Sequence, residues 1–570
     1  MPLERQRNRM AAAGVWCVTN MERLLKHKTI VEWLRNGLFL ALIVTGTLVA
    51  MGRLWSPHAV PGAVASAPVK ESVEGVDRVV RDVDAAFEQE WVKQSVAPAP
   101  VAANLTLARR LSLALTGTVP SLQEIRGFEA QPEEGQLHWW IARLFADRRY
   151  SDYFAERFAR AYVGVEDGPF FVFRRRRLVQ WLSDALHENR PYDQVARQLI
   201  DSKGVWTTRP ETNFLTATIE PEKGPDKGKL AARVSRAFLG VRIDCVECHD
   251  GKLGSTWKQR DFHQLAAFFG QTEMSLAGLQ DNPKKHYEYR FLRQPAAEAV
   301  PPVVPWAPEL MPEKVEPRER LAGWVTAPGN RPFARAIVNR VWALLFNRPL
   351  VTPVDDIPLE GPYPPGLDLL ADDFTAHGSD LRRLIRVITA TRVFQLDSHS
   401  ADPNHPPTEE AEKHWAAFPM TRLRPEQMAG SVIQASSLTT IDAESHVLYR
   451  LKRLFATGDF LKRYGDLGED EFGSKNGTIP QRLLMMNGEV VQDHLKANPI
   501  MNASTRIGTL APNDASAIET AYLAIFARRP TPEEAEFFIG KLGAAGKQRG
   551  EAMADLYWTL MNSTEFSWNH

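Results

Sequence analysis

The pentapeptide Cys245-Val246-Glu247-Cys248-His249 has residue types and a spacing that point to a specific chemistry. Two cysteines three positions apart can each bond one vinyl group of a haem, and the adjacent histidine can then ligate the iron. In a chain with 3 cysteines and 14 histidines, chance would produce this pattern about 4 times in 10,000 such sequences. The sequence therefore predicts covalently bound haem c, with Cys245 and Cys248 as attachment points and His249 as the proximal ligand.

Two other interpretations of the same residues stay open. The cysteines could close a small disulfide in an oxidising compartment. They could also bind zinc together with His249 and His263, although zinc ribbons usually bring a second CxxC pair and this sequence has none. The remaining cysteine, Cys17, lies far from the motif and is expected to be inert.

The sixth iron ligand is less well determined than the proximal one. His263 is the first candidate distal ligand, Met274 and His286 follow it, and an open five-coordinate iron is equally admissible. Charged residues near the motif are expected to tune the reduction potential: Arg242, Asp244 and Asp250. The sequence identifies no catalytic residue and leaves open whether the protein is an enzyme.

The N-terminal region predicts a membrane anchor. Residues 1–36 form a basic tail, and an uncharged apolar run follows at Gly37–Gly52. As a helix this run would span about 24 Å, and its flanking residues would complete a transmembrane helix over 37–55. The basic residues before it predict a cytosolic tail, with an inner-membrane anchor and the bulk of the chain in the periplasm or another extracytoplasmic space. A cleaved signal peptide or a buried core helix is the alternative.

Composition limits the class of protein. The chain has 570 residues, 44% of them hydrophobic and 24% charged, which excludes a wholly disordered, collagen-like or polytopic membrane protein. Lys+Arg and Asp+Glu balance at 69 each, so nucleic acid is not an expected partner. The expected partners are the membrane and a protein of the cell envelope.

Beyond a linker at 56–71, apolar residues recur with the helical period, so we expect a mainly α fold of two predominantly helical domains. The first domain is predicted at 72–293 and the second at 318–570. The proline density of 294–317 predicts the linker between them. Helices are predicted at Leu137–Phe145, Asp152–Tyr162, Leu178–His187, Tyr192–Ile200, Ala231–Leu239, Arg335–Phe346, Leu381–Ala390 and Arg424–Ser437. Ser121–Glu124 has the form of a capping box.

The order of these landmarks resembles the planctomycete cytochrome-like family, which joins two domains of unknown function. The resemblance covers roughly Val79 to His570. It rests on these segments: Arg109–Pro120, Pro191–Leu199, Phe238–Phe269, Phe333–Leu350, Thr421–Met428, Pro480–Asn487, Ala527–Glu534 and Trp558–His570.

The resemblance implies an extracytoplasmic cytochrome-like protein with a partner, since the genes of relatives often neighbour a second, sulfatase-like family. Relatives usually carry a second histidine two positions after the motif, where this chain has Gly251. Any function of that histidine is therefore missing here. The leading hypothesis is electron transfer to or from a partner protein by a membrane-anchored c-type haem protein. The alternatives are a cell-envelope scaffolding protein without haem and a subunit of a polysaccharide-degrading system.

Overall fold

The structure is a computed structural model that describes residues 75–165, 173–220, 223–251, 257–291, 294–400, 408–442, 478–495 and 502–570. It also describes the isolated positions 39, 45, 445, 460, 461, 463, 464 and 472. The chain divides into two compact units, Met1–Ala67 and Pro68–His570. Nearly all described residues belong to the second unit, and the fold below is that of this unit.

The predicted fold class needs a correction at its N-terminal element. We expected a transmembrane helix over 37–55, but no helix among the described residues is both long and apolar enough to cross a bilayer. Apart from Phe39 and Thr45, the predicted span lies outside the described residues. The physical reason is that a span needs about 20 consecutive apolar residues, whereas polar and charged residues interrupt the apolar residues of the described helices.

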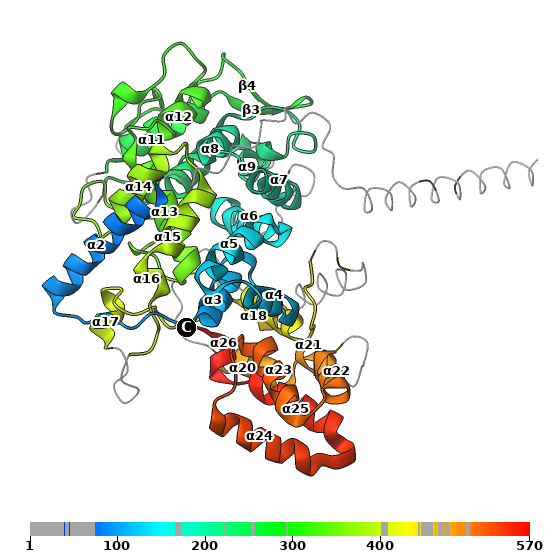
Figure 1. Cartoon of the computed structure of the whole chain (residues 1–570). Coiled ribbons are helices and arrows are strands. Elements are labelled where there is room, and N and C mark those ends of the chain that lie inside the picture. Colours follow the sequence, from blue (N-terminus) through cyan, green and yellow to red (C-terminus); the bar gives the residue numbers. More distant parts are fainter. Residues whose placement is uncertain are drawn as a thin grey trace, which may run out of the picture. The chain divides into compact units, whose positions relative to one another are not determined.

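Helices make up most of the described residues before the cysteine motif (Figure 1). Ser121 begins α4 as a capping box: its hydroxyl accepts from the Glu124 amide, and the Glu124 carboxylate accepts from the Ser121 amide. This confirms the predicted helix start. The helices are α2 (Val76–Gln94), α3 (Asn104–Thr116), α4 (Leu122–Glu129), α5 (Gln136–Ala146), α6 (Arg148–Val163), α7 (Arg175–His187), α8 (Tyr192–Asp201), α9 (Asn213–Thr216) and α10 (Lys227–Val234).

The strands that the structure describes are short and form four antiparallel pairs. The longest pair is the hairpin of β3 (Thr272–Ser275) and β4 (Gly278–Asp281), which lies at one end of the second unit in Figure 1. The other pairs are β1 (Ile219–Glu220) with β2 (Gly224–Pro225), β5 (Glu288–Tyr289) with β6 (Glu298–Ala299), and β7 (Thr421–Arg422) with β8 (Trp568–Asn569).

The helices after the motif complete the unit, with α24 and α25 at the opposite end from the hairpin (Figure 1). They are α11 (Gln259–Ala266), α12 (Pro317–Val325), α13 (Arg331–Phe346), α14 (Leu367–Ala376), α15 (Leu381–Ala390), α16 (Arg392–Gln395), α17 (Glu409–Lys413), α18 (Pro425–Ala435), α20 (Ile479–Asn487), α21 (Glu489–Leu495), α22 (Ala503–Leu510), α23 (Asp514–Phe526), α24 (Pro532–Ala545), α25 (Arg549–Met561) and α26 (Thr564–Ser567).

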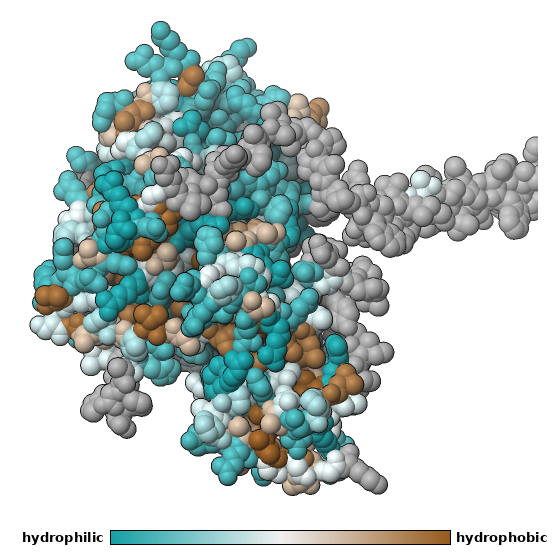
Figure 2. Space-filling model, in the orientation of Figure 1, coloured by the Kyte–Doolittle hydropathy of each residue, from teal (hydrophilic) through white to brown (hydrophobic). Residues whose placement is uncertain are grey.

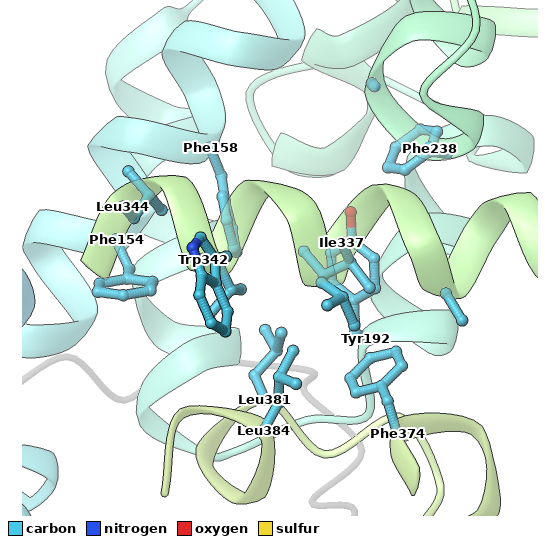
Figure 3. Close-up of a cluster of buried hydrophobic side chains, with 14 of the residues drawn as sticks. Phe154, Phe158, Tyr192, Phe238, Ile337, Trp342, Leu344, Phe374, Leu381 and Leu384 are labelled. Carbon is cyan, nitrogen blue, oxygen red and sulfur yellow. The ribbon is translucent and has the colours of Figure 1, made fainter. Parts of the chain in front are cut away.

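The main hydrophobic core surrounds α13. Fourteen consecutive residues of this helix, Phe333 to Phe346, are buried, so it has no solvent face. Figure 3 shows Trp342 and Ile337 of α13 among aromatic and aliphatic side chains from the helices around it, including Phe158 and Leu384. The same core takes residues from both sides of the Pro-rich segment 294–317. Burial on this scale is the main source of stability in such a fold.

A second core fills the C-terminal helices. It consists mainly of residues between Leu423 and Phe566, and Leu113 and Val119 from the N-terminal half join it. On the face of the molecule drawn in Figure 2, apolar residues occur in small separate areas among hydrophilic ones. That distribution is ordinary for a globular surface.

Candidate haem-attachment site

The cysteine motif lies on the surface at the end of a helical segment. After α10 the chain continues as a π-helical turn, Ser235–Leu239, and then a short 3-10 turn, Asp244–Val246, carries the first cysteine. Both Cys245 and Cys248 are exposed free thiols. Val246 between them is fully buried, so it anchors the turn while the sulfur atoms remain accessible.

One ring nitrogen of His249 is hydrogen-bonded to the backbone. Its Nδ1 lies 2.8 Å from the carbonyl oxygen of Asp250. A carbonyl only accepts hydrogen bonds, so Nδ1 carries the proton and the lone pair of the neutral ring is on Nε2. Metal-ligating histidines commonly make such a bond with their other ring nitrogen. The geometry of His249 therefore fits the predicted proximal ligand.

The backbone of the motif is held at Glu247. Its carbonyl oxygen accepts from His263 Nε2 at 2.9 Å, from Gln259 Nε2 at 3.0 Å and from the Tyr289 hydroxyl at 3.4 Å. The next turn is fixed as well, because the Asp250 carboxylate accepts from the backbone N–H of Gln259 at 2.9 Å, at the start of α11. Helix α11 thus forms the frame against which the motif is positioned.

His263, the expected distal ligand, lies behind the motif and is 1% exposed. Its Nε2 donates to Glu247, and its Nδ1 lies 2.9 Å from the Tyr287 hydroxyl. Its ring stacks on Tyr289 with the ring centroids 3.4 Å apart. Burial lowers the pKa of His263, so the ring is neutral and Nδ1 accepts from Tyr287. Both of its nitrogens are therefore engaged within the protein.

The tyrosines of this cluster are kept protonated. Burial raises the pKa of Tyr287, and its neighbour Tyr289 adds to the shift. Burial also raises the pKa of Tyr289, and the nearby Cys248 and Glu247 contribute in the same direction.

The other candidate sixth ligands occupy different places. Met274 lies on β3 and packs partly buried against the main core. His286 is exposed, in the segment between β4 and β5. The structure brings neither of them into the hydrogen-bonded cluster around Glu247.

The charged residues expected near the motif form ion pairs. Asp244 pairs with Arg236, whose Nε lies 3.3 Å from Asp244 Oδ1. Arg242 pairs with Asp355 through Nε at 2.9 Å and through Nη2 at 2.6 Å. Asp250 instead accepts from the Gln259 N–H at the start of α11. These ion pairs hold the segment around the motif in place, and they neutralise the charges of Asp244 and Arg242.

The same geometry bears on the zinc and disulfide interpretations of the motif. Among the described residues, no group of three or more His, Cys, Asp or Glu side chains is arranged to hold a metal ion. The proposed fourth zinc ligand, His263, has both nitrogens in hydrogen bonds. The two thiols are not joined to each other.

A cavity elsewhere on the molecule has no part in this site. Its volume is about 480 Å³, and none of its lining residues belongs to the motif. The lining residues are Trp139, Ala142, Arg143, Ala146, Asp147, Arg148, His187 and Asp442.

Sequence reasoning missed several residues of the site. Gln259 and Tyr289 bind the Glu247 carbonyl, and Asp355 pairs with Arg242. Gln259 lies in Phe238–Phe269, one of the segments that carry the family resemblance, and this signal could have identified it as a residue of the site. Asp355 is 113 residues from Arg242 in the chain, and a single sequence contains no signal for such a pair.

Comparison with protein-family models gives two matches. Residues 82–274 match PSCyt2, described as a protein of unknown function (DUF1549), and residues 317–455 match PSD1, described as a protein of unknown function (DUF1553). The first match contains the cysteine motif, and the second contains Asp355. No curated protein matches the chain. No solved structure matches it either.

Proposed function

Because the chain belongs to the planctomycete cytochrome-like family, which pairs these two domains, we propose that it is a c-type haem protein exchanging electrons with a partner protein outside the cytoplasm. One observation carries the proposal. The exposed thiols of Cys245 and Cys248 stand beside a histidine whose Nδ1 is bonded to a carbonyl.

The residues of the motif fit this cofactor. Cys245 and Cys248 would hold it through thioether bonds, and His249 would present Nε2 to the iron. When bound, haem supplies one-electron redox chemistry at the iron. The protein's contribution is to orient His249 through the Asp250 carbonyl and to fix the loop through Glu247.

Exposure of the motif favours electron transfer over buried catalysis. The two cysteines and His249 are all exposed, and a haem attached there would have an edge accessible to another protein. Haem attachment requires reduced thiols at the moment of ligation, and in c-type proteins this takes place outside the cytoplasm. The proposed location follows from that requirement.

The first test is the mass of the cysteine peptide. The full chain would be expressed in a host that matures c-type cytochromes, digested, and analysed for the peptide that contains Cys245 and Cys248. We expect one haem mass on this peptide and a pyridine haemochrome spectrum from the intact protein. Substitution C245S or C248S should abolish the double attachment, whereas C17S should leave it unchanged and serves as the matched control.

The same experiment can refute the proposal. Protein produced in a host that attaches haem to a control cytochrome, yet recovered with both thiols unmodified, would exclude the redox function. A mass lower by two hydrogens on the cysteine peptide would identify a disulfide instead. Retention of a partner in the absence of haem would then favour the scaffolding alternative.

A further inference from the structure

The segment just before the cysteine motif is bound by residues outside its own family domain. Three neighbouring contacts join residues 240–242 to residues 355–357. Ile357 N–H donates to the Gly240 carbonyl at 2.7 Å, the Asp356 carboxylate accepts from the Arg242 N–H at 3.4 Å, and the Asp355 carboxylate accepts from the Arg242 guanidinium at 2.9 Å.

The backbones approach closely because Gly240 has no side chain. Its φ is +60°, in the left-handed region that favours glycine. A Cβ at this position would lie 3.1 Å from Ala336 Cβ and 3.2 Å from Ile357 Cδ1. Ile357 is 5% exposed. The contact is thus packed as well as hydrogen-bonded.

Asp355 is connected to the motif by charge. It is 9% exposed and pairs with Arg242, and Arg236 Nη1 lies 3.9 Å away from its other carboxylate oxygen. Arg236 in turn binds Asp244, the residue immediately before Cys245. Two arginines of the first family domain therefore converge on one acid of the second.

We propose that Asp355 is a positioning residue for the cysteine motif, supplied by the second family domain to fix the segment that presents Cys245, Cys248 and His249. This inference deepens the proposed function and rests on it for its role in haem attachment. It also gives a physical reason for the pairing of the two domains. Without the acid, Arg236 and Arg242 lose their shared partner, and of the three contacts to residues 355–357 only those made by Asp356 and Ile357 still hold the segment.

The decisive measurement is hydrogen exchange in the full chain without haem, so it does not depend on the proposed function. The amides of Val246 and Glu247 bond to carbonyls within the turn, at 3.2 Å in each case. In D355N we expect these amides to exchange about fivefold faster, which corresponds to about 1 kcal/mol of local opening free energy. D355E should restore most of the protection.

The matched control is D368N. Asp368 pairs with Arg335 at 2.7 Å, and both residues lie in the second domain. This variant should leave exchange at the motif unchanged. If D355N does not fold, R242Q removes the same contact from the partly exposed partner, and the same increase in exchange is expected.

A second measurement concerns the haem-loaded protein. Removing the Asp355 charge leaves two arginines less compensated, which disfavours the oxidised iron, so the midpoint potential of D355N should rise and its haem yield should fall. D355E should return the potential toward that of the unmodified chain, and D368N should not move it.

The outcomes separate the two proposals. Unchanged exchange at Val246 and Glu247 in both D355N and R242Q would overturn the positioning role, whether or not haem is present. An unmodified chain that never acquires haem would overturn the proposed function alone, because the exchange result would still decide the positioning role. A faster exchange without a change in potential would limit Asp355 to a structural contact and overturn its proposed role at the haem.

Discussion

The hydrogen bonds of His263 lead to a quantitative prediction for H263F. Phenylalanine keeps the aromatic ring that stacks on Tyr289 but removes two hydrogen bonds, one to the Glu247 carbonyl and one from the Tyr287 hydroxyl. A hydrogen bond contributes about 1 kcal/mol to stability, and a buried group left unpaired costs about 1–3 kcal/mol. The Glu247 carbonyl retains Gln259 as a donor, whereas Tyr287 loses its acceptor. We therefore expect H263F to lower the free energy of unfolding by about 2 kcal/mol.

The assay is urea unfolding of the full chain, followed by circular dichroism and tryptophan fluorescence. The matched control is H286N, because His286 is exposed nearby, and this variant should change stability by less than about 0.5 kcal/mol. The variant Y287F removes the other partner of the bond. Since the two groups bind each other, H263F/Y287F should cost about 1 kcal/mol less than the sum of the single changes.

Two results would refute this reasoning. One is a loss in H263F no larger than that of H286N, which would mean that the hydrogen bonds of His263 contribute nothing to stability. The other is strict additivity of H263F and Y287F, which would mean that the two side chains are not bonded to each other. A further readout is the spectrum of the haem-loaded protein, which H263F should leave unchanged if both ring nitrogens of His263 are engaged as described.

Three other predictions concern the ion pair of Asp281 with Arg318 and the close approach at Gly240. In D281N, Arg318 loses a bidentate partner at 2.8 Å while it is itself 1% exposed, so we expect a loss of about 3 kcal/mol in urea unfolding. Burial raises the pKa of Asp281, but Arg318 outweighs this effect, so the pKa is lowered overall. The contribution of ionised Asp281 to folding stability is therefore complete above about pH 4 and is lost as the pH falls through the lowered pKa. The difference in stability between the unmodified chain and D281N should accordingly shrink in acid unfolding curves. Substitution G240A should cost about 1–3 kcal/mol, because alanine strains the left-handed backbone and its Cβ would lie 3.2 Å from Ile357; a neutral result in thermal unfolding would contradict the close approach.

Local sequence signals determined the helices well. The helix expected at Leu381–Ala390 has these bounds in the structure, and the helix expected at Tyr192–Ile200 continues one residue further, to Asp201. Ser121 caps its helix as its spacing predicts. Such features depend on residues within a few positions of one another, so periodicity and capping chemistry suffice to identify them. The expected transmembrane helix shows the limit of this reasoning. An apolar run indicates that a segment is buried, but it does not distinguish burial in a membrane from burial in a protein core.

The sequence by itself also determined the candidate chemistry, since the cysteines and the histidine of the attachment motif are adjacent in the chain. Only the tertiary structure decided what surrounds them. His263 follows the motif closely enough to be considered an iron ligand, yet folding of α11 turns one nitrogen to the Glu247 carbonyl and the other to Tyr287. Asp355 reaches Arg242 across 113 positions. Contacts of this kind arise from the packing of distant segments around a shared core, and no spacing within one sequence encodes them.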